Sequence, residues 1–318
     1  MTAEAVARSA LITRLKVRLR DGQRTIRERF LAGGDAVCLL HERSQLVDKV
    51  LCELWNDLSL PASLALIAVG GYGRGELYPA SDVDLLILLP EQADDVLTTR
   101  IEQLICVFWD VGLETGHSVR TIEQCLEEAA GDITVQTAML EARLLIGSSS
   151  LFRGLTVLIR SSLDAPAFFQ SKRIQQEDRH QRFSDTSYSL EANCKEGPGG
   201  LRDLQLILWI AQAAGYGKSW KDLELCGFIT DEEAQLLTAC EAFLCRLRIH
   251  LHLHAGRRED RLLFEYQTAL AEKLGFNATA DLRASETLMQ QYYRTAKTVT
   301  QINAIILQNI GTALFPPP

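Results

Sequence analysis

The first part of the chain has apolar positions spaced as on one face of a helix. Leucine and valine side chains recur three and four residues apart between Leu39 and Leu54. The pattern stops before the segment Leu58-Ser59-Leu60-Pro61, where serine and proline interrupt it. We therefore predict a helical N-terminal lead-in over residues 1–59.

Short apolar runs then replace the helical spacing. Residues 64–69 and 83–89 each form a run of the length that is typical of a buried strand. Between them, residues 70–75 contain four glycines, which favour a tight turn over a regular element. The pattern predicts a strand, a turn with a short helix, and a second strand.

A third strand and further helices are predicted next. Residues 93–111 return to helical spacing, and residues 113–120 have the pattern of a strand. A helix is expected to begin at Thr121, because Gln124 follows at the spacing of a capping box. We predict that a small sheet flanked by helices occupies residues 60–147.

Helical periodicity dominates the rest of the chain. It runs from Ser149 onward with a break at residues 194–200, which contain three glycines and a proline. An amphipathic run follows at residues 201–214. We therefore expect an all-helical domain over residues 148–318, and an α+β class for the whole chain.

Composition narrows the class of protein. The 318 residues are 47% hydrophobic and 23% charged, which is typical of a soluble globular protein. The strongest apolar run, residues 83–89, contains Asp84 and is far shorter than the roughly 20 residues that cross a bilayer. The basic N-terminus has a helical pattern unlike that of a signal peptide. We expect a cytoplasmic protein that does not bind membranes.

Charge and cysteine usage exclude two further classes of function. The net charge of -8 argues against a dedicated nucleic-acid binder, which would carry a basic surplus. The eight cysteines contain no C-x-x-C pair and are read as reduced thiols instead of zinc ligands or disulfides.

Two aspartates carry the candidate chemistry. Side chains two apart in a strand point to the same face, so Asp82 and Asp84 should project together while Val83 and Leu85 enter the core. Two carboxylates a few ångströms apart repel each other unless a cation lies between them. Mg²⁺ prefers such oxygens and completes its shell with water and phosphate oxygens, so this pair is a candidate metal site.

The glycines before the pair are candidates for phosphate binding. Gly70 and Gly71 allow a phosphate to approach the backbone, and the short helix after them would point its amide groups at that phosphate. Arg74 could add a charge-assisted contact. We include Ser81, directly before the pair, in the nucleotide-binding set. The combination predicts nucleotidyl transfer, with in-line attack on the α-phosphorus and release of pyrophosphate.

Two other glycine-loop motifs are excluded. A dinucleotide-binding fingerprint that begins at Gly71 would need glycine at position 76, which is Glu76. A P-loop would need a Gly-Lys-Ser/Thr sequence, and this loop contains no lysine.

These residues carry a resemblance to a known family. The segment GGYGRGELYPASDVDLLIL, residues 70–88, resembles the signature of the nucleotidyltransferase superfamily that includes DNA polymerase β, in the form found in PII-protein uridylyltransferases. The block at residues 195–203, KEGPGGLRD, is similar to the helical domain that these enzymes share with glutamine synthetase adenylyltransferases. The resemblance covers nearly all of residues 40–310 and implies a polymerase-β-like nucleotidyltransferase domain followed by a helical domain.

The resemblance also implies an activity. It implies that Gly70 and Gly71 bind nucleotide phosphates, that Asp82 and Asp84 hold Mg²⁺ or Mn²⁺, and that UTP donates UMP to a tyrosine of the PII nitrogen-regulatory protein. Members of the family also carry an HD hydrolase domain and two glutamine-sensing ACT domains. The sequence ends at Pro318 without a His-Asp dyad of the HD type. We therefore expect the N-terminal part of a longer enzyme, without nucleotide removal or glutamine control of its own.

A third metal ligand is common in the superfamily and often lies on a later strand. Glu114 is the only acidic residue of the third predicted strand, so it is our candidate. The alternative for Glu114 is a solvated acid at the edge of the strand.

The loop at residues 195–203 has two compatible interpretations. Its glycines and Pro198 could simply separate two helices, with Asp203 complementing the start of the next helix. Alternatively, Lys195 and Arg202 could hold the triphosphate over the aspartate pair.

The sequence leaves two alternatives for the function. Nothing in the phosphate and metal motif reads the base, so adenylyl transfer to a nitrogen-regulation protein is possible. A module that binds nucleotide or docks a partner without turnover is the alternative from another class.

Overall fold

The computed structural model describes residues 3–184 and 191–316. The chain divides into two compact units, residues 1–162 and residues 163–318. Among the described residues, every helix is too short or too polar to cross a lipid bilayer.

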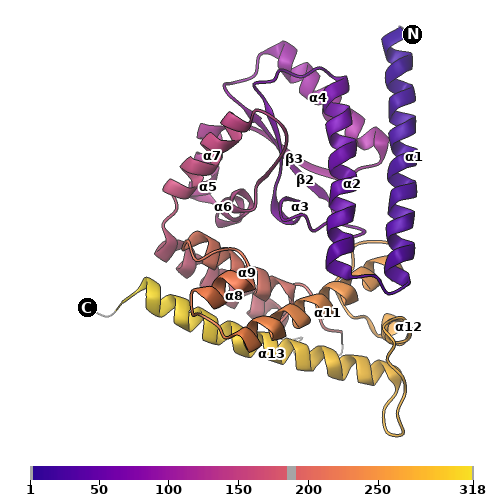
Figure 1. Ribbon diagram of the computed structural model, residues 1–318, viewed down its shortest axis with the longest axis vertical. Coiled ribbons are helices and arrows are strands. Elements are labelled where there is room, and N and C mark those ends of the chain that lie inside the picture. Colours follow the sequence, from indigo (N-terminus) through magenta and orange to yellow (C-terminus); the bar gives the residue numbers. More distant parts are fainter. Residues whose placement is uncertain (1–2, 185–190, 317–318) are drawn as a thin grey trace. The chain divides into compact units, whose positions relative to one another are not determined.

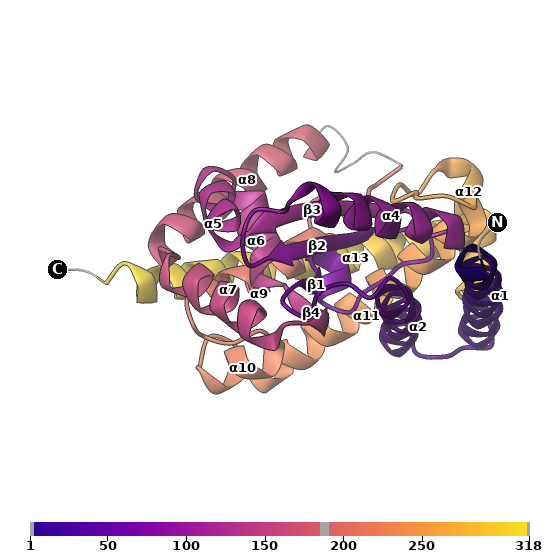
Figure 2. The same ribbon diagram turned by 90° about the horizontal axis from the view of Figure 1, so that it is seen from above.

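The first unit is built on a small mixed sheet, as predicted, with four strands where the sequence predicted three. The strand order is β3-β2-β1-β4, and the strands are Ala65–Ala68 (β1), Val83–Leu89 (β2), Thr115–Thr121 (β3) and Arg143–Gly147 (β4). β1 pairs antiparallel with both β2 and β4, and β2 pairs in parallel with β3. Figure 2 shows the four strands side by side in this order.

Strand β4 was not recognised from the sequence. Its apolar run, Leu144 to Ile146, is only three residues long, which is too short for a clear strand pattern. β4 pairs antiparallel with the edge of β1 that β2 does not occupy. Their pairing is irregular between Leu66 and Ile67, which marks a bulge.

In the described part of the first unit, seven helices accompany the sheet. They are Ala3–Leu31 (α1), Ala36–Asp57 (α2), Gly70–Gly73 (α3), Asp95–Val111 (α4), Ile122–Gly131 (α5), Ile133–Leu140 (α6) and Ser149–Ser161 (α7). Local signals set their starts: Thr121 and Gln124 form the predicted capping box of α5, and Asp94 accepts a hydrogen bond from the amide of Leu97 in α4. Figure 1 shows α1 and α2 as a hairpin beside the sheet.

The helical lead-in shares the core of the sheet. Val47, Leu51 and Leu54 of α2 are at most 1% exposed and belong to the same buried cluster as Leu66 of β1 and Ile87 of β2. α2 is therefore part of the first unit and not a separate appendage.

The first unit ends later than the boundary expected at residue 147. Helix α7 contacts β1, β4, α5 and α6, because Leu155 and Ile159 are buried on its inner face. The division accordingly falls after Ser162.

The second unit is helical, as predicted. Its helices are Ala165–Ser184 (α8), Leu201–Ala213 (α9), Trp220–Leu225 (α10), Asp231–Ala255 (α11), Phe264–Lys273 (α12) and Ala284–Leu314 (α13). α9 is the central one, because it contacts α8, α11 and α13 and is buried along most of its length. An isolated bridge between Asn193 and Arg261 fixes the segment before α9.

Candidate functional site

The glycine loop is a closed turn between β1 and β2. The expected short helix is the single turn α3, in which the amides of Gly73 and Arg74 donate to the carbonyls of Val69 and Gly70 at 3.0 and 3.1 Å. The amide of Glu76 donates back to the carbonyl of Gly71 at 2.9 Å. Gly70 has a φ of +58°, a conformation that glycine adopts without strain.

The aspartate pair lies on one face, as the strand period predicted. Asp82 and Asp84 are exposed, whereas Val83 and Leu85 are 3% and 2% exposed. Asp82 directly precedes β2 and Asp84 is its second residue. Val83 and Leu85 therefore anchor the strand in the core, which leaves the alternating carboxylates of Asp82 and Asp84 on the outer face.

The carboxylate of Asp84 lies between two glycines. A Cβ added to Gly70 would stand 3.6 Å from Asp84 Oδ2, and one added to Gly116 would stand 2.7 Å from Oδ1. Gly116 is the register partner of Asp84 in the parallel pair of β2 and β3. A side chain at position 116 would force the carboxylate to shift, so glycine there allows Asp84 to take this position.

Gly116 was missed by the sequence analysis. A glycine inside a strand pattern is a known signal for close approach of another group. What Gly116 approaches depends on the pairing of β2 with β3, which the sequence alone did not give.

Glu114 is not brought into a three-ligand group. Its carbonyl accepts a hydrogen bond from the amide of Val83 at 2.8 Å, which joins the start of β3 to β2, and its side chain is exposed. Within residues 3–184 and 191–316, no cluster of three or more His, Cys, Asp or Glu side chains has a metal-binding arrangement. The role of Glu114 as a metal ligand stays a prediction.

The aspartate pair itself suits a hard divalent cation. Both members offer carboxylate oxygens, which Mg²⁺ and Mn²⁺ bind, and two protein carboxylates leave coordination positions for water and phosphate oxygens. Gly70 and Gly116, on either side of Asp84, contribute no side chain next to its carboxylate.

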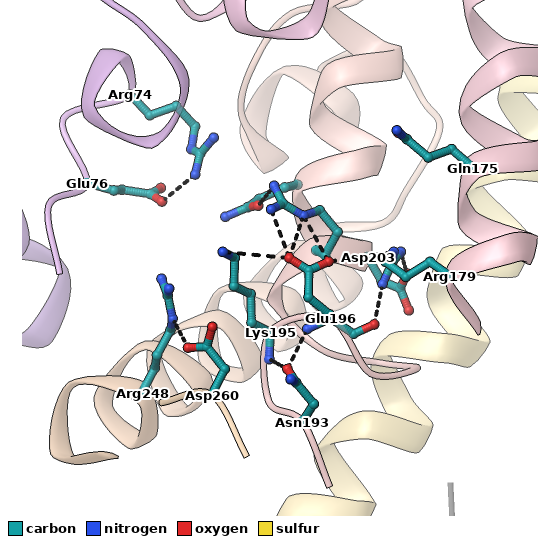
Figure 3. A network of polar contacts seen from close by, with 12 residues as sticks. Arg74, Glu76, Gln175, Arg179, Asn193, Lys195, Glu196, Asp203, Arg248 and Asp260 are labelled. Carbon is teal, nitrogen blue, oxygen red and sulfur yellow. Dashed lines mark hydrogen bonds and ion pairs between the residues drawn. The ribbon is translucent and has the colours of Figure 1, made fainter. Parts of the chain in front are cut away.

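Arg74 is engaged by two carboxylates. One terminal nitrogen lies 3.0 Å from Glu76 Oε2, as Figure 3 shows, and the other contacts the buried Glu141 at the end of α6. Burial disfavours the charge of Arg74, but the two carboxylates outweigh it and raise its pKa. In this arrangement Arg74 joins the glycine loop to α6, and direct contact with a phosphate stays a prediction.

Ser81 lies in the turn before the aspartates. Its amide donates to the carbonyl of Tyr78 at 3.1 Å, and its side chain is partly exposed. Its part in nucleotide binding is likewise untested.

Lys195 and Arg202, in the second unit, share one carboxylate. Lys195 Nζ lies 3.6 Å from Glu196 Oε1, and Arg202 Nη2 donates to the same oxygen at 2.9 Å. Figure 3 shows Lys195 and Glu196 side by side. Burial, together with the nearby charges of Arg248 and Arg202, lowers the pKa of Lys195.

Asp203 anchors the same loop from within. It is fully buried and accepts hydrogen bonds from Gln176 at 2.9 Å, from His180 at 2.9 and 3.0 Å and from the amide of Gly199 at 2.7 Å, and it pairs with Arg179. Burial alone would raise the pKa of Asp203, but the bond from His180 and the charge of Arg179 lower it to about 2. Asp203 thus stays ionised and holds the loop against α8.

Two protein-family models match separate parts of the chain. The family model for a nucleotidyltransferase domain matches residues 47–133, and the model for GlnD PII-uridylyltransferase matches residues 167–307. Nucleotidyltransferases generally use a nucleoside triphosphate and a divalent metal ion.

Several bacterial proteins are similar over most of the chain. A bifunctional uridylyltransferase/uridylyl-removing enzyme of Burkholderia lata is 55% identical over 289 residues, which cover 91% of this chain and 34% of the relative. An enzyme of the same name from Burkholderia vietnamiensis is 51% identical over 317 residues, or 99% of this chain and 37% of the relative. The chain thus spans about a third of the length of these relatives.

Proposed function

We infer that this chain belongs to the family of GlnD PII-uridylyltransferases, whose model matches residues 167–307, and from that premise we propose that it transfers UMP from UTP to a tyrosine of a PII nitrogen-regulatory protein. The observation that carries the proposal is the position of Asp84. Its carboxylate lies on the exposed face of β2 between Gly70 of the loop and Gly116 of β3, with Asp82 two residues before it.

Asp82 and Asp84 would hold the divalent ion, Mg²⁺ or Mn²⁺. The ion would neutralise phosphate charge and favour the departure of pyrophosphate. Gly70 and Gly71 lie at the start of α3, where the absence of side chains lets the phosphates approach the backbone.

In the reaction, the tyrosine hydroxyl oxygen forms a bond to the α-phosphorus of UTP. The bond between that phosphorus and the bridging oxygen to the β-phosphorus breaks, and pyrophosphate leaves with the bonding electrons. The phenolic proton passes to solvent. Such transfers depend mainly on positioning and charge neutralisation, so the main task of the chain is to hold the reactants in line.

Arg74 keeps the loop in place while this happens. Its two terminal nitrogens pair with Glu76 and Glu141, so Arg74 stabilises the segment that follows α3. A nucleotide phosphate could compete for the same guanidinium group.

The test is a transfer assay on the chain itself. Purified chain is incubated with PII protein, Mn²⁺ or Mg²⁺, and UTP or ATP labelled on the α-phosphate. We expect label on a tyrosine of the PII protein with UTP, together with one pyrophosphate per label.

The other outcomes identify the alternatives. Label from ATP in place of UTP would show adenylyl transfer. Binding of nucleotide without label on the PII protein would contradict the proposal and indicate a binding module. The variant Asp82→Asn serves as the inactive control.

A further inference from the structure

Helix α2 contacts the glycine loop with polar side chains. His41, Ser44 and Asp48 lie on one face of the helix, three and four residues apart. The imidazole of His41 lies against Gly75, where an added Cβ would stand 2.7 Å from its Nδ1. Arg43, beside this face, donates to the carbonyl of Pro79 at 3.0 Å.

Asp48 is the centre of these contacts. It accepts a hydrogen bond from the hydroxyl of Tyr72 at 2.5 Å, and it pairs with Arg143 of β4 through both oxygens at 2.8 and 3.1 Å. Arg143 also donates to Ser44 Oγ at 3.2 Å. The pair therefore ties α2, β4 and the loop together.

Arg143 reaches the backbone of the loop. It donates to the carbonyl of Tyr72 and, through Nε, to that of Gly73, both at 3.3 Å. Its guanidinium group also lies 5.5 Å from the centre of the Tyr72 ring. Tyr72 is thus held by its ring, its hydroxyl and its carbonyl, directly after Gly70 and Gly71.

We propose that Asp48 and Arg143 are positioning residues of the nucleotide site, which set the conformation of Tyr72 and Gly73 and thereby the distance of Gly70 and Gly71 from Asp84. This inference rests on the proposed function, because it assumes that these glycines contact the phosphates. It extends the site beyond the nucleotidyltransferase match at residues 47–133, since Arg143 and the first turns of α2 lie outside that range.

The groups that position the nucleotide tolerate little displacement. A displacement of about 1 Å in a group that positions a substrate can cost two orders of magnitude in rate. A single four-residue turn has few internal hydrogen bonds of its own, so contacts from α2 and β4 add to those that Arg74 makes with Glu141.

The test measures nucleotide affinity separately from transfer. The variants are Arg143→Lys, which keeps the charge but loses the planar fork, Asp48→Asn, and Tyr72→Phe, which deletes only the hydroxyl. Binding of UTP with Mn²⁺ is measured by calorimetry. We expect affinity to fall about tenfold in Arg143→Lys and Asp48→Asn and less in Tyr72→Phe.

A control variant separates positioning from stability. Glu53→Gln removes another carboxylate of α2, which pairs with Arg14 and Arg18 of α1 and does not face the loop. We expect this variant to keep the affinity of the wild-type chain. Amide exchange at residues 70–75 should rise in Arg143→Lys and not in Glu53→Gln.

The outcomes are decisive in each case. The inference would be overturned, while the proposed function stands, if Tyr72→Phe and either Asp48→Asn or Arg143→Lys fold and bind UTP with wild-type affinity. If only Tyr72→Phe folds, unchanged affinity and unchanged exchange in that variant overturn the inference. Failure of the wild-type chain to bind UTP with Mn²⁺ would overturn both the proposed function and the inference.

Discussion

The two glycine-rich loops of the chain look alike in sequence, but Gly71 at the start of one differs from the glycines of the other in why glycine is needed. At residues 195–203 the fold itself requires it. A Cβ on Gly199 would stand 2.1 Å from the carbonyl oxygen of Ala296, and one on Gly197 would stand 2.5 Å from that of Asn193. Neighbouring backbone atoms already occupy the space that a side chain at either position would need.

The loop at residues 70–75 is different at its start. A Cβ on Gly71 would meet Arg74 and Glu76 only at 3.6 Å, which is ordinary contact, and Gly71 has no positive φ. The fold would accept alanine there, and alanine is the better helix former. The glycine at this position is therefore better explained by a ligand that approaches the backbone than by packing.

The largest effect should come from adding a methyl group to the loop at residues 195–203. Gly199→Ala should destabilise the chain by about 3 kcal/mol or more, because the new methyl group collides with backbone and the φ of +73° adds strain. Denaturant unfolding measures the loss.

Gly215→Ala is the matched control for that experiment. Gly215 also has a positive φ, of +78°, but nothing lies within 4 Å of an added Cβ. The expected cost is about 1–2 kcal/mol from strain alone. Equal losses in the two variants would contradict the packing argument.

Removing the charge of Asp203, which anchors the loop at residues 195–203, should have the next largest effect on stability. Asp203→Asn should cost about 3 kcal/mol near neutral pH, because it leaves the partners of a buried carboxylate uncompensated. The measurement is urea unfolding of both proteins across a range of pH.

The pH dependence of this difference has a defined sign. The pKa of Asp203 is lowered from 3.8 to about 2 in the folded chain, so ionised Asp203 stabilises the fold above pH 3.8. About 2 kcal/mol of that stabilisation should disappear as the pH falls from about 4 to 2. A difference between wild type and variant that is constant down to pH 2 would refute this account of the anchor.

At the start of the loop at residues 70–75, a substitution should affect nucleotide binding and not stability. Gly71→Ala should leave the free energy of unfolding unchanged or slightly higher, yet weaken binding of UTP with Mn²⁺ by about tenfold, since the methyl group occupies the approach to the backbone. The control is Gly131→Ala at the end of α5, outside the glycine loop, where an added Cβ meets nothing within 4 Å. Equal nucleotide affinity in both variants would remove the distinction between the loops.

The smallest effect concerns the cations of the second loop. If Lys195 and Arg202 contact the triphosphate, alanine at either position should weaken nucleotide binding by about threefold, and added salt should reduce the difference. Lys297→Ala, which removes an exposed lysine of α13, is the control. Unchanged affinity in both test variants would leave the loop with a structural role alone.

Local signals in the sequence predicted much of this arrangement. The alternation around Val83 placed Asp82 and Asp84 on one face, and the spacing of Thr121 and Gln124 gave the start of α5, because both depend on neighbours along the chain. The helical second unit followed from its periodicity in the same way.

The remaining features depend on contacts between distant residues. Gly116 acquires its role only through the pairing of β2 with β3, and Arg143 lies 95 positions from Asp48 in sequence. The engagement of Arg74 by Glu141 also needed the position of α6. Hydrophobic periodicity carries no information about such pairs.

The most direct test of the central claim is a transfer assay with Asp82→Asn and Asp84→Asn. Each variant removes metal-binding charge and relieves repulsion between the two carboxylates, so the melting temperature without metal should hold or rise. Labelling of the PII protein from UTP and Mn²⁺ should fall about a thousandfold or more in both. Transfer at the wild-type rate in either variant would contradict the assignment of Asp82 and Asp84 as the metal-binding pair.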